Sequence, residues 1–251
     1  MERLLVTGAS RGIGSAAALA LARPGRHIVT VSRGRAGLEA TRRAIESKGA
    51  EASVYVCDLA VPSDVDRMND ELGDLDGIVL NAGVSNNRSF CESTSDAFER
   101  ELQVNYLSPV QILRHHLPAL VRRNGGHVVA VTSLTALVPF PGNATYAASK
   151  AAILALFRSL RVEMDGTGVT FGCVLPGYTD TEMTRAMETR APPMSAEVVG
   201  QAVADCYERR LSFVVPGTMN RAAARMFGAF PRVSDALMTR FVDFMVPKNR
   251  G

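Results

Sequence analysis

Several residue types and patterns are scarce in this 251-residue chain, and each scarcity excludes a class of protein. The chain has no tryptophan and no long run of lysine or arginine, which argues against a nucleic-acid-binding surface. No stretch approaches the roughly 18 uninterrupted apolar residues that a membrane-spanning helix needs, so we expect no transmembrane segment. With 47% hydrophobic and 21% charged residues, the chain can nonetheless bury a sizeable core.

Cysteine and histidine are also sparse. The four cysteines form no CxxC pair and the four histidines show no ligand spacing, so we expect reduced thiols and no metal site. The opening residues, MERLLVTGAS, lack the apolar core and cleavage site of a signal peptide. These absences favour a soluble cytoplasmic protein.

Short apolar runs alternate with helical stretches along most of the chain. The runs are nearly continuous, which is typical of strands in a parallel sheet that is buried on both faces. Their alternation with helices predicts an α/β fold with a doubly wound, seven-stranded parallel sheet and right-handed crossovers. No repeat or linker interrupts the pattern, so we predict a single domain over residues 1–251. The predicted strands are RLLVT, HIVTVS, ASVYVC, DGIVLN, GHVVAVTS, VTFGCVL and SFVVP.

The longest predicted helix contains two prolines, Pro109 and Pro118. Proline lacks an amide hydrogen and clashes with the preceding turn, so we expect kinks or breaks at both. The predicted helices cover residues 38–48, 63–72, 96–122 and 196–209, and another begins near Tyr146.

The first predicted strand ends in TGASRGIG, which places Gly8, Gly12 and Gly14 at a strand-to-helix turn. Glycines there let the backbone approach a pyrophosphate, to which the next helix presents free N–H groups. The spacing is GxxxGxG rather than the GxGxxG of the standard dinucleotide fingerprint. A merely tight turn is the alternative, but its position in the sheet favours a dinucleotide cofactor.

The end of the second strand bears on which dinucleotide is bound. NAD-preferring sites usually have an acid here, which accepts from the ribose 2′-OH. This chain has Ser32 and Arg33 instead, and Arg11 lies in the glycine turn. Two guanidinium groups near a 2′-phosphate favour NADP(H) over NAD(H), because arginine binds phosphate through two hydrogen bonds. A solvated surface role for either arginine stays open.

The stretch TYAASKAAILALF places a phenol and an amine one helical turn apart, at Tyr146 and Lys150. A tyrosine at a helix start and a lysine whose stem covers apolar surface are the structural alternative. Together the two side chains suit carbonyl chemistry. A free tyrosine has a pKa of about 10, and a nearby ammonium group lowers that pKa toward neutral pH.

Seven motifs in a fixed order resemble the short-chain dehydrogenase/reductase family, over about residues 3–216. No single motif is specific, but seven in the family's order on a matching strand pattern are. The resemblance implies a Rossmann fold and an NAD(P)-dependent oxidoreductase that interconverts a ketone and a secondary alcohol. The motifs are TGxxxGxG, CDL from Cys57, NAG from Asn81, the Asn of QVNYL, the Ser of AVTSLTA, YxxxK and PGYTDT from Pro176.

The resemblance implies roles for four catalytic residues. Tyr146 is the general acid, while Lys150 tunes its pKa and holds the nicotinamide ribose. Ser133, at the end of the fifth strand, stabilises the charge that develops on the substrate oxygen. Asn105 lies at a helix irregularity and holds a water that links Lys150 to solvent.

The resemblance also implies a set of cofactor contacts. Asp58 and Leu59 flank the adenine, Asn81 supports the adenosine ribose, and Thr181 contacts the nicotinamide carboxamide. A turn cap at Asp58 and an N-cap at Thr181 are the structural alternatives. The expected cofactor residues are Gly8, Ser10, Arg11, Gly12, Ile13, Gly14, Ser32, Arg33, Asp58, Leu59, Asn81, Ala82, Gly83, Tyr146, Lys150, Pro176, Gly177, Thr179 and Thr181.

The C-terminal part departs from the family pattern. Members that reduce 3-oxoacyl carrier-protein thioesters end soon after a DGG strand. Here residues 217–251 follow, which we predict to be a helical extension of the same domain, broken near Pro231. The extension resembles branches that reduce lipophilic ketones, such as 3-ketosphinganine and hydroxysteroid reductases. Its apolar side chains suit a substrate cover, an interface or a membrane surface. They are Met226, Phe227, Phe230, Leu237, Phe241, Phe244 and Met245.

Residues 181–195 fall where the family places its substrate lid. They include Met183, Met187 and Met194, which suit a flexible apolar substrate, although a mobile loop is the alternative. The missing DGG ending argues against the family's tetramer, and the resemblance implies a homodimer through the helices at residues 96–122 and 146–165, with a tetramer as the alternative. We therefore predict an NADPH-dependent carbonyl reductase that acts on a lipophilic small molecule. A 3-oxoacyl thioester reductase, a physiological alcohol dehydrogenase and a non-catalytic NADP(H) sensor are the alternatives.

Overall fold

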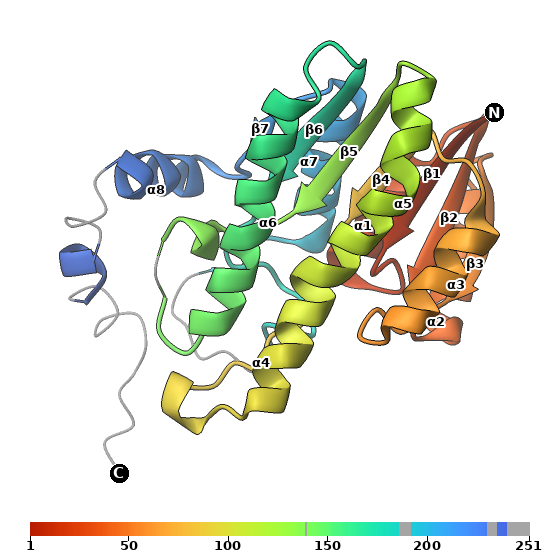
Figure 1. Cartoon of the computed structure of the whole chain (residues 1–251). Helices are drawn as coiled ribbons and strands as arrows, with labels where there is room; N and C mark the ends of the chain where they lie inside the picture. Colours follow the sequence, from red (N-terminus) through yellow and green to blue (C-terminus); the bar gives the residue numbers. More distant parts are fainter. Residues whose placement is uncertain (139, 186–191, 230–234, 240–251) are drawn as a thin grey trace.

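Seven parallel strands form one sheet in the computed structural model, in the order β3-β2-β1-β4-β5-β6-β7 (Figure 1). The structure describes residues 1–138, 140–185, 192–229 and 235–239. Every neighbouring pair of strands is parallel, so the predicted α/β fold with a doubly wound sheet is confirmed. The strands are β1 (Glu2–Thr7), β2 (Arg26–Ser32), β3 (Glu51–Val56), β4 (Gly77–Leu80), β5 (Gly126–Val131), β6 (Val169–Val174) and β7 (Phe213–Val214).

Helices cover both faces of this sheet. These are α1 (Gly12–Leu21), α2 (Arg35–Glu46) and α7 (Ala196–Glu208) on one face and α3 (Pro62–Leu72), α5 (Ser108–Arg122) and α6 (Ala144–Glu163) on the other. Two further helices, α4 (Ser95–Leu102) and α8 (Thr218–Ala229), lie beyond the sheet (Figure 1). In β1, Leu4 and Val6 point into the core that contains α1, α2 and α7, while Leu5 points into the core that contains α3, α5 and α6. All three are fully buried, which explains the continuous apolar runs.

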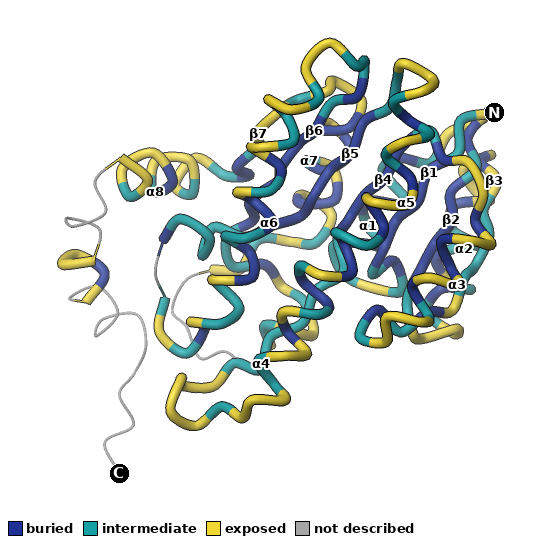
Figure 2. The backbone as a smooth tube through the Cα atoms, viewed as in Figure 1, coloured by how far each residue is buried: buried dark blue, intermediate teal, exposed yellow. Residues whose placement is uncertain are grey.

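Burial is concentrated in the central strands, whereas α8 is mostly exposed (Figure 2). The edge strand β3 is only half-buried along most of its length. None of the helices that the structure describes is both long and apolar enough to cross a membrane.

The long helix predicted over residues 96–122 is present, but its irregularity is not at the prolines. α4 ends at Leu102, a π-helix covers Gln103–Leu107, and α5 follows directly. Pro109 is the second residue of α5, which follows the π-helix without a break, and α5 continues through Pro118. The breaks predicted at Pro109 and Pro118 are therefore wrong. The other predicted helices are confirmed to within one turn.

The C-terminal extension begins by packing against its own domain. A Cβ atom on Gly177 would lie 2.6 Å from Asn220 Nδ2 of α8, and one on Gly217 would lie 2.9 Å from Met194 Cε. The start of the extension therefore contacts the segment that follows β6. Five of the apolar residues named above lie outside the described residues: Met187, Phe230, Phe241, Phe244 and Met245.

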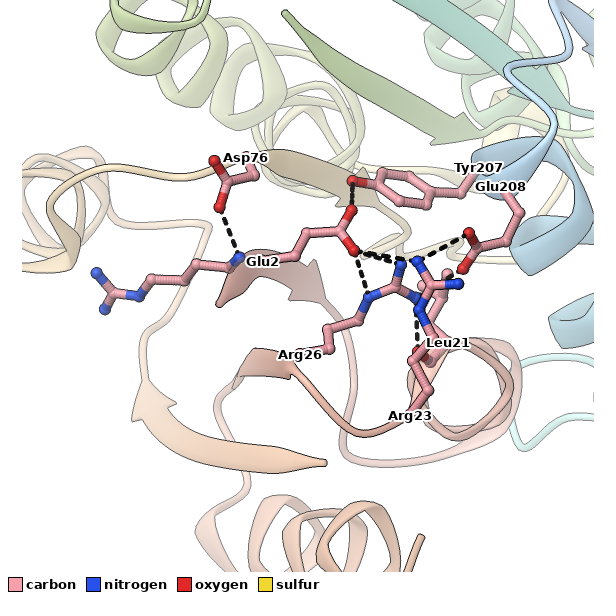
Figure 3. Close-up of polar contacts among 8 residues, drawn as sticks. Glu2, Leu21, Arg23, Arg26, Asp76, Tyr207 and Glu208 are labelled. Carbon is pink, nitrogen blue, oxygen red and sulfur yellow. Dashed lines mark hydrogen bonds and ion pairs between the residues drawn. The ribbon is translucent and has the colours of Figure 1, made fainter. Parts of the chain in front are cut away.

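A buried arginine joins β1, β2 and α7 at the amino edge of the sheet (Figure 3). Arg26 is 1% exposed and donates to Glu2 Oε2 at 2.5 and 2.9 Å, to Glu208 Oε1 at 2.7 Å and to the Leu21 carbonyl at 2.6 Å. Tyr207 in turn donates to Glu2 Oε1 at 2.9 Å. Burial alone would raise the pKa of Glu2, but the hydrogen bonds from Arg26 and Tyr207 lower it overall. This cluster closes the edge opposite the predicted site.

We expect Glu208→Gln to lower the free energy of unfolding by about 1–2 kcal/mol, because Arg26 keeps only one carboxylate, that of Glu2. Urea unfolding measures the effect. Glu46→Gln is the matched control, since Glu46 pairs with Arg42 on the surface at 2.6 Å and such pairs contribute about 0.5 kcal/mol. Equal losses in both variants would contradict the structural importance of the buried cluster.

Candidate active site

The predicted site residues follow the strands that meet where the strand order reverses. The chain runs from β1 outward to β2 and β3, then returns to place β4 on the other side of β1. Ligands of doubly wound sheets bind outside the carboxyl ends of the strands at such a point. The segments after β1, β4, β5 and β6 therefore converge on one region, as the sequence predicts.

The glycine turn after β1 is possible only with glycine at its key positions. Gly8 and Gly12 have φ of 68° and 56°, which side chains disfavour. A Cβ atom on Gly14 would lie 2.3 Å from the Gly8 carbonyl oxygen and 2.4 Å from Asn81 Nδ2. These close approaches bring the start of α1 against the ends of β1 and β4.

The N-terminus of α1 is open to a ligand. Arg11 occupies the N-cap position without a side-chain cap, and no acid lies in the first turn, which includes Ile13. Its first amides therefore keep their donors for an anion such as a pyrophosphate. Ser10 lines the same turn, and a Cβ atom on Gly37 would lie 2.6 Å from its carbonyl oxygen. The cradle suits the pyrophosphate of a dinucleotide.

Asn81 and Ala82 tie the end of β4 to the end of β1. Their amides donate to Thr7 Oγ1 at 3.0 and 3.1 Å, and Asn81 Nδ2 donates to the Thr7 carbonyl at 3.0 Å. The side chain of Asn81 therefore shapes the glycine turn. This is a structural contribution, and its expected contact with a ribose stays a prediction.

The two arginines expected at a 2′-phosphate differ in their surroundings. Arg11 forms an exposed ion pair with Glu182 at 2.6 Å. Arg33 is exposed at the end of β2 and forms no ion pair with any residue that the structure describes. Ser32 Oγ accepts from the Gly34 amide at 3.2 Å, which shapes the turn there. Arg33 is thus the more available of the two cations.

Asp58 and Leu59 lie just beyond β3. Asp58 Oδ1 accepts from the Ala60 amide at 3.0 Å, and Oδ2 lies 3.7 Å from Arg100 of α4. Leu59 is 6% exposed and belongs to the core. The turn role considered for Asp58 is therefore present, and any contact with adenine would be additional.

Lys150 is buried in the second turn of α6. It is 4% exposed, and its Nζ donates to the Val131 carbonyl at 3.1 Å and lies 5.7 Å from the centre of the Tyr146 ring. A Cβ atom on Gly83 would lie 3.1 Å from this Nζ, so the NAG glycine makes room for the ammonium. Burial lowers the pKa of Lys150 to about 8.

Tyr146 differs electrostatically from the sequence-based expectation. Burial raises its pKa to about 12, the Ser133 hydroxyl acts in the opposite direction, and Glu101 raises the pKa further. The expected lowering by Lys150 is not found, because the lysine is itself desolvated and stands over the ring while donating to Val131. Tyr146 is therefore a neutral phenol at pH 7.

Asn105 lies within the π-helix between α4 and α5, so the expected irregularity is confirmed. The side chain is 2% exposed and fully engaged. Its Oδ1 accepts from the Val84 amide at 2.8 Å, while Nδ2 donates to the Val84 carbonyl at 2.9 Å and to Ser149 Oγ at 3.0 Å. Asn105 therefore fastens the loop after β4 to α6.

Ser133 directly follows β5 and Thr132. Its Oγ accepts from Thr135 Oγ1 at 2.9 Å and from the Thr135 amide at 3.2 Å. Two donors on one hydroxyl oxygen leave its own hydrogen free to point elsewhere. Thr135 is a supporting residue that the sequence reasoning missed, since only the turn after β5 brings it back onto Ser133.

The segment after β6 covers the glycine turn. Pro176 accepts from the Leu134 amide at 2.8 Å, and the buried Thr179 donates through Oγ1 to the Gly177 carbonyl at 3.0 Å. A Cβ atom on Gly12 would lie 3.4 Å from the methyl carbon of Thr181. Thr181 is not the N-cap of a helix in the described part of the chain.

Polar side chains that no motif includes line the remaining side. Ser85 Oγ lies 2.9 Å from Asn87 Oδ1 and 3.2 Å from Asn143 Oδ1, and Asn87 Nδ2 donates to the Met183 carbonyl at 3.1 Å. These contacts join the loop after β4 to the start of α6 and to the expected lid. The sequence reasoning missed them, because isolated Ser and Asn residues carry no periodic signal.

Comparison with known proteins shows the family and the fold of this chain. The family model described as short chain dehydrogenase matches residues 2–191. A solved short-chain dehydrogenase from Sphingobium yanoikuyae in complex with NADPH is similar over 95% of both chains, with a TM-score of 0.83 and 28% identity.

Two curated relatives have higher sequence identity. A 3-oxoacyl-(acyl-carrier-protein) reductase from Aggregatibacter actinomycetemcomitans is 35% identical over 72% of this chain and 78% of its own length. Short-chain dehydrogenase/reductase 3 from Bos taurus is 31% identical over 87% of this chain and 76% of its own. With the family model matching most of the chain, this protein belongs to the short-chain dehydrogenase/reductase family of NAD(P)-dependent oxidoreductases, which act on alcohol and carbonyl groups.

Proposed function

We propose that this protein is an NADPH-dependent carbonyl reductase that interconverts a ketone and a secondary alcohol. The observation that carries the proposal is a neutral Tyr146 phenol beside Ser133 and above the buried Lys150, at the carboxyl edge of a dinucleotide-type sheet. Reduction of a ketone needs a proton donor at the developing alkoxide, and a neutral phenol supplies one.

The roles of the side chains follow from their contacts. Bound NADPH would supply the hydride for the carbonyl carbon. Tyr146 donates its phenol proton to the carbonyl oxygen, and Ser133 donates a hydrogen bond that stabilises the growing charge there. Lys150, with a pKa of about 8, is largely protonated at pH 7, and its ammonium group would hold the nicotinamide ribose. Asn105 holds the elements that frame this pair.

The residues present fit an NADP(H) dinucleotide. The glycine cradle and the uncapped start of α1 suit its pyrophosphate, and Arg33 and Arg11 suit a 2′-phosphate. No acid ends β2 to accept from a ribose 2′-OH. Preference for NADPH over NADH is therefore part of the proposal.

The ion pair between Arg11 and Glu182 would compete with the 2′-phosphate for the same guanidinium. We expect Glu182→Gln to tighten NADPH binding about two- to fivefold at low salt, since exposed pairs contribute at most about 1 kcal/mol. NADH affinity stays unchanged. Fluorescence titration measures both, with the distant exposed Glu163→Gln as control. An equal gain for NADH would contradict competition at the phosphate.

An apolar ketone is the proposed substrate class. Met183 and Met194 border the site, and α8 packs against the segment after β6. The 35% identity with a 3-oxoacyl-(acyl-carrier-protein) reductase favours a second candidate, a 3-oxoacyl thioester. The polar group of Ser85, Asn87 and Asn143 is also compatible with a more polar substrate.

A ketone panel tests the proposal. NADPH oxidation is measured with a short 3-oxoacyl thioester, a long-chain 3-keto base, a steroid ketone and a small aromatic ketone. A rate with one bulky apolar ketone is the expected result, and a rate confined to the thioester selects the second candidate. No rate with any ketone of the panel, with NADPH binding intact, would leave a substrate outside the panel or a non-catalytic sensor.

A homodimer is the proposed assembly. Leu102 and Leu107 are exposed along α4 and the π-helix, at 44% and 43%, and Leu107 borders a shallow groove on α5 with Val110. Light scattering after size exclusion tests this, and Leu107→Glu is expected to give monomers.

A further inference from the structure

A buried carboxylate lies close to Tyr146 and belongs to none of the seven motifs. Glu101, in the last turn of α4, is 3% exposed. Its neighbour Arg100 pairs with Asp58, and no cation in the described part of the chain forms an ion pair with Glu101. Burying a carboxylate without a cation is costly, so the contacts it makes in return are informative.

Both oxygens of Glu101 accept short hydrogen bonds from segments that frame the site. Oε1 accepts from the Asn86 amide at 2.6 Å, in the loop after β4. Oε2 accepts from Thr145 Oγ1 at 2.5 Å, in the first turn of α6. One side chain therefore connects α4, the loop after β4 and the start of α6, and the two donors compensate part of the cost of burial.

The same arrangement recurs one helical turn later. Asn105 lies four residues after Glu101, in the π-helix, and contacts the same loop after β4 and the same helix α6 through Val84 and Ser149. Glu101 and Asn105 therefore act as two successive ties between the loop after β4 and α6. Only the second of these ties is included in the motifs.

Each of the two ties is made to a residue that directly precedes a proposed catalytic residue. Thr145 immediately precedes Tyr146, and Ser149 immediately precedes Lys150. The tie through Glu101 thus fixes the first turn of α6, which carries the phenol. The tie through Asn105 fixes the second turn, which carries the amine.

Glu101 also differs from Asn105 in carrying a charge. Glu101 from α4 and Lys150 from α6 are the ionisable groups that face Tyr146 among the described residues. Burial has the largest effect on the pKa of Tyr146 and raises it, the hydrogen bond with Ser133 lowers it, and the negative charge of Glu101 raises it. A carboxylate here disfavours the phenolate.

We propose that Glu101 is a positioning residue for Tyr146, which fixes the first turn of α6 through Thr145 and adds a negative charge that opposes ionisation of the phenol. This inference rests on the proposed function, in which that proton is delivered to the substrate oxygen. Glu101 touches neither substrate nor reacting atoms in this role.

Three variants distinguish the effect of the hydrogen bond between Glu101 and Thr145 from the effect of the negative charge of Glu101. Glu101→Gln keeps the size of the side chain and removes the charge. Thr145→Val keeps the charge and removes the donor. Glu99→Gln is the matched control, since Glu99 is an exposed glutamate on the same helix.

Two measurements report the pH at which the Tyr146 phenol ionises. The first is the alkaline limb of kcat/KM for ketone reduction, where activity falls as the phenol ionises. The second is carbon NMR of protein labelled at the tyrosine phenol carbon, with and without NADP⁺. The chain has only five tyrosines, and the Tyr146→Phe spectrum assigns the signal.

In Glu101→Gln we expect both readouts to shift about 0.5–1 pH unit downward, because loss of a nearby negative charge stabilises the phenolate. Glu99→Gln leaves them unchanged. Thr145→Val keeps the titration in place but lowers kcat several-fold with little change in KM.

If the titration of the Tyr146 phenol in Glu101→Gln matches that of the native protein, the proposal is overturned. If Glu101→Gln does not fold, full activity in Thr145→Val overturns it instead. Should the native protein reduce no ketone, the NMR titration still tests Glu101. A shifted titration with no turnover would then refute the proposed function and leave the effect of Glu101 on Tyr146 standing.

Discussion

Tyr146→Phe is expected to lower kcat for ketone reduction by about 10²–10⁴-fold while changing the Kd for NADPH less than about twofold. The substitution removes only the phenol hydroxyl, which is the proposed proton donor. The ring remains, so Lys150 keeps its position over it and its hydrogen bond to Val131. Steady-state kinetics and fluorescence titration with NADPH measure the two quantities.

Tyr55→Phe is the matched control for this loss. Tyr55 lies in β3 and donates to Glu71 at 2.7 Å, away from the carboxyl edge after β4 and β5. We expect its kcat to match the native value. Activity retained in Tyr146→Phe would remove the tyrosine from the proposed mechanism, and lost NADPH binding would make its role structural.

Arg33→Asp is expected to lower the ratio of kcat/KM for NADPH to that for NADH by about 10²-fold. The change removes an exposed cation that no described residue pairs with. It also places a carboxylate at the end of β2, where it can accept from a ribose 2′-OH. Kinetics with both cofactors at fixed ionic strength measure the ratio, since phosphate contacts depend on salt.

Arg122→Asp controls for the change in net charge. Arg122 is exposed at the end of α5, just before β5, so it lies at the opposite edge of the sheet. Its ratio of cofactor efficiencies is expected to equal the native ratio. An unchanged ratio in Arg33→Asp would mean that the 2′-phosphate is recognised elsewhere, with Arg11 the next residue to test.

The strands were predictable because a strand that is buried on both faces of a sheet is apolar at nearly every position. Residues such as Leu4, Leu5 and Val6 are all fully buried, so the run is apolar throughout. The path of the helix over residues 96–122 was less predictable. Proline rules placed breaks at Pro109 and Pro118, whereas the structure places the irregularity at Asn105, where only the family resemblance predicted one. The side chain of Asn105 is held by Val84, a contact between segments far apart in the chain.

The candidate site was predictable where chemistry needs a fixed local spacing. Gly8 and Gly14 are required by close backbone approach, and Tyr146 and Lys150 share one helix face. The supporting contacts were not predictable from such spacing. Glu101 is one acid among many in the sequence, and only its contacts with Asn86 and Thr145 distinguish it.

The amino-acid sequence by itself determined the α/β sheet, the glycine turn and the Tyr146–Lys150 pair, because each depends on periodicity or spacing within one segment. The tertiary structure alone decided the proton states. The pKa of Tyr146 is raised to about 12 and that of Lys150 lowered to about 8, since both side chains are desolvated and Glu101 comes from another helix. Burial and the approach of distant charges depend on how the elements pack, which no local spacing records.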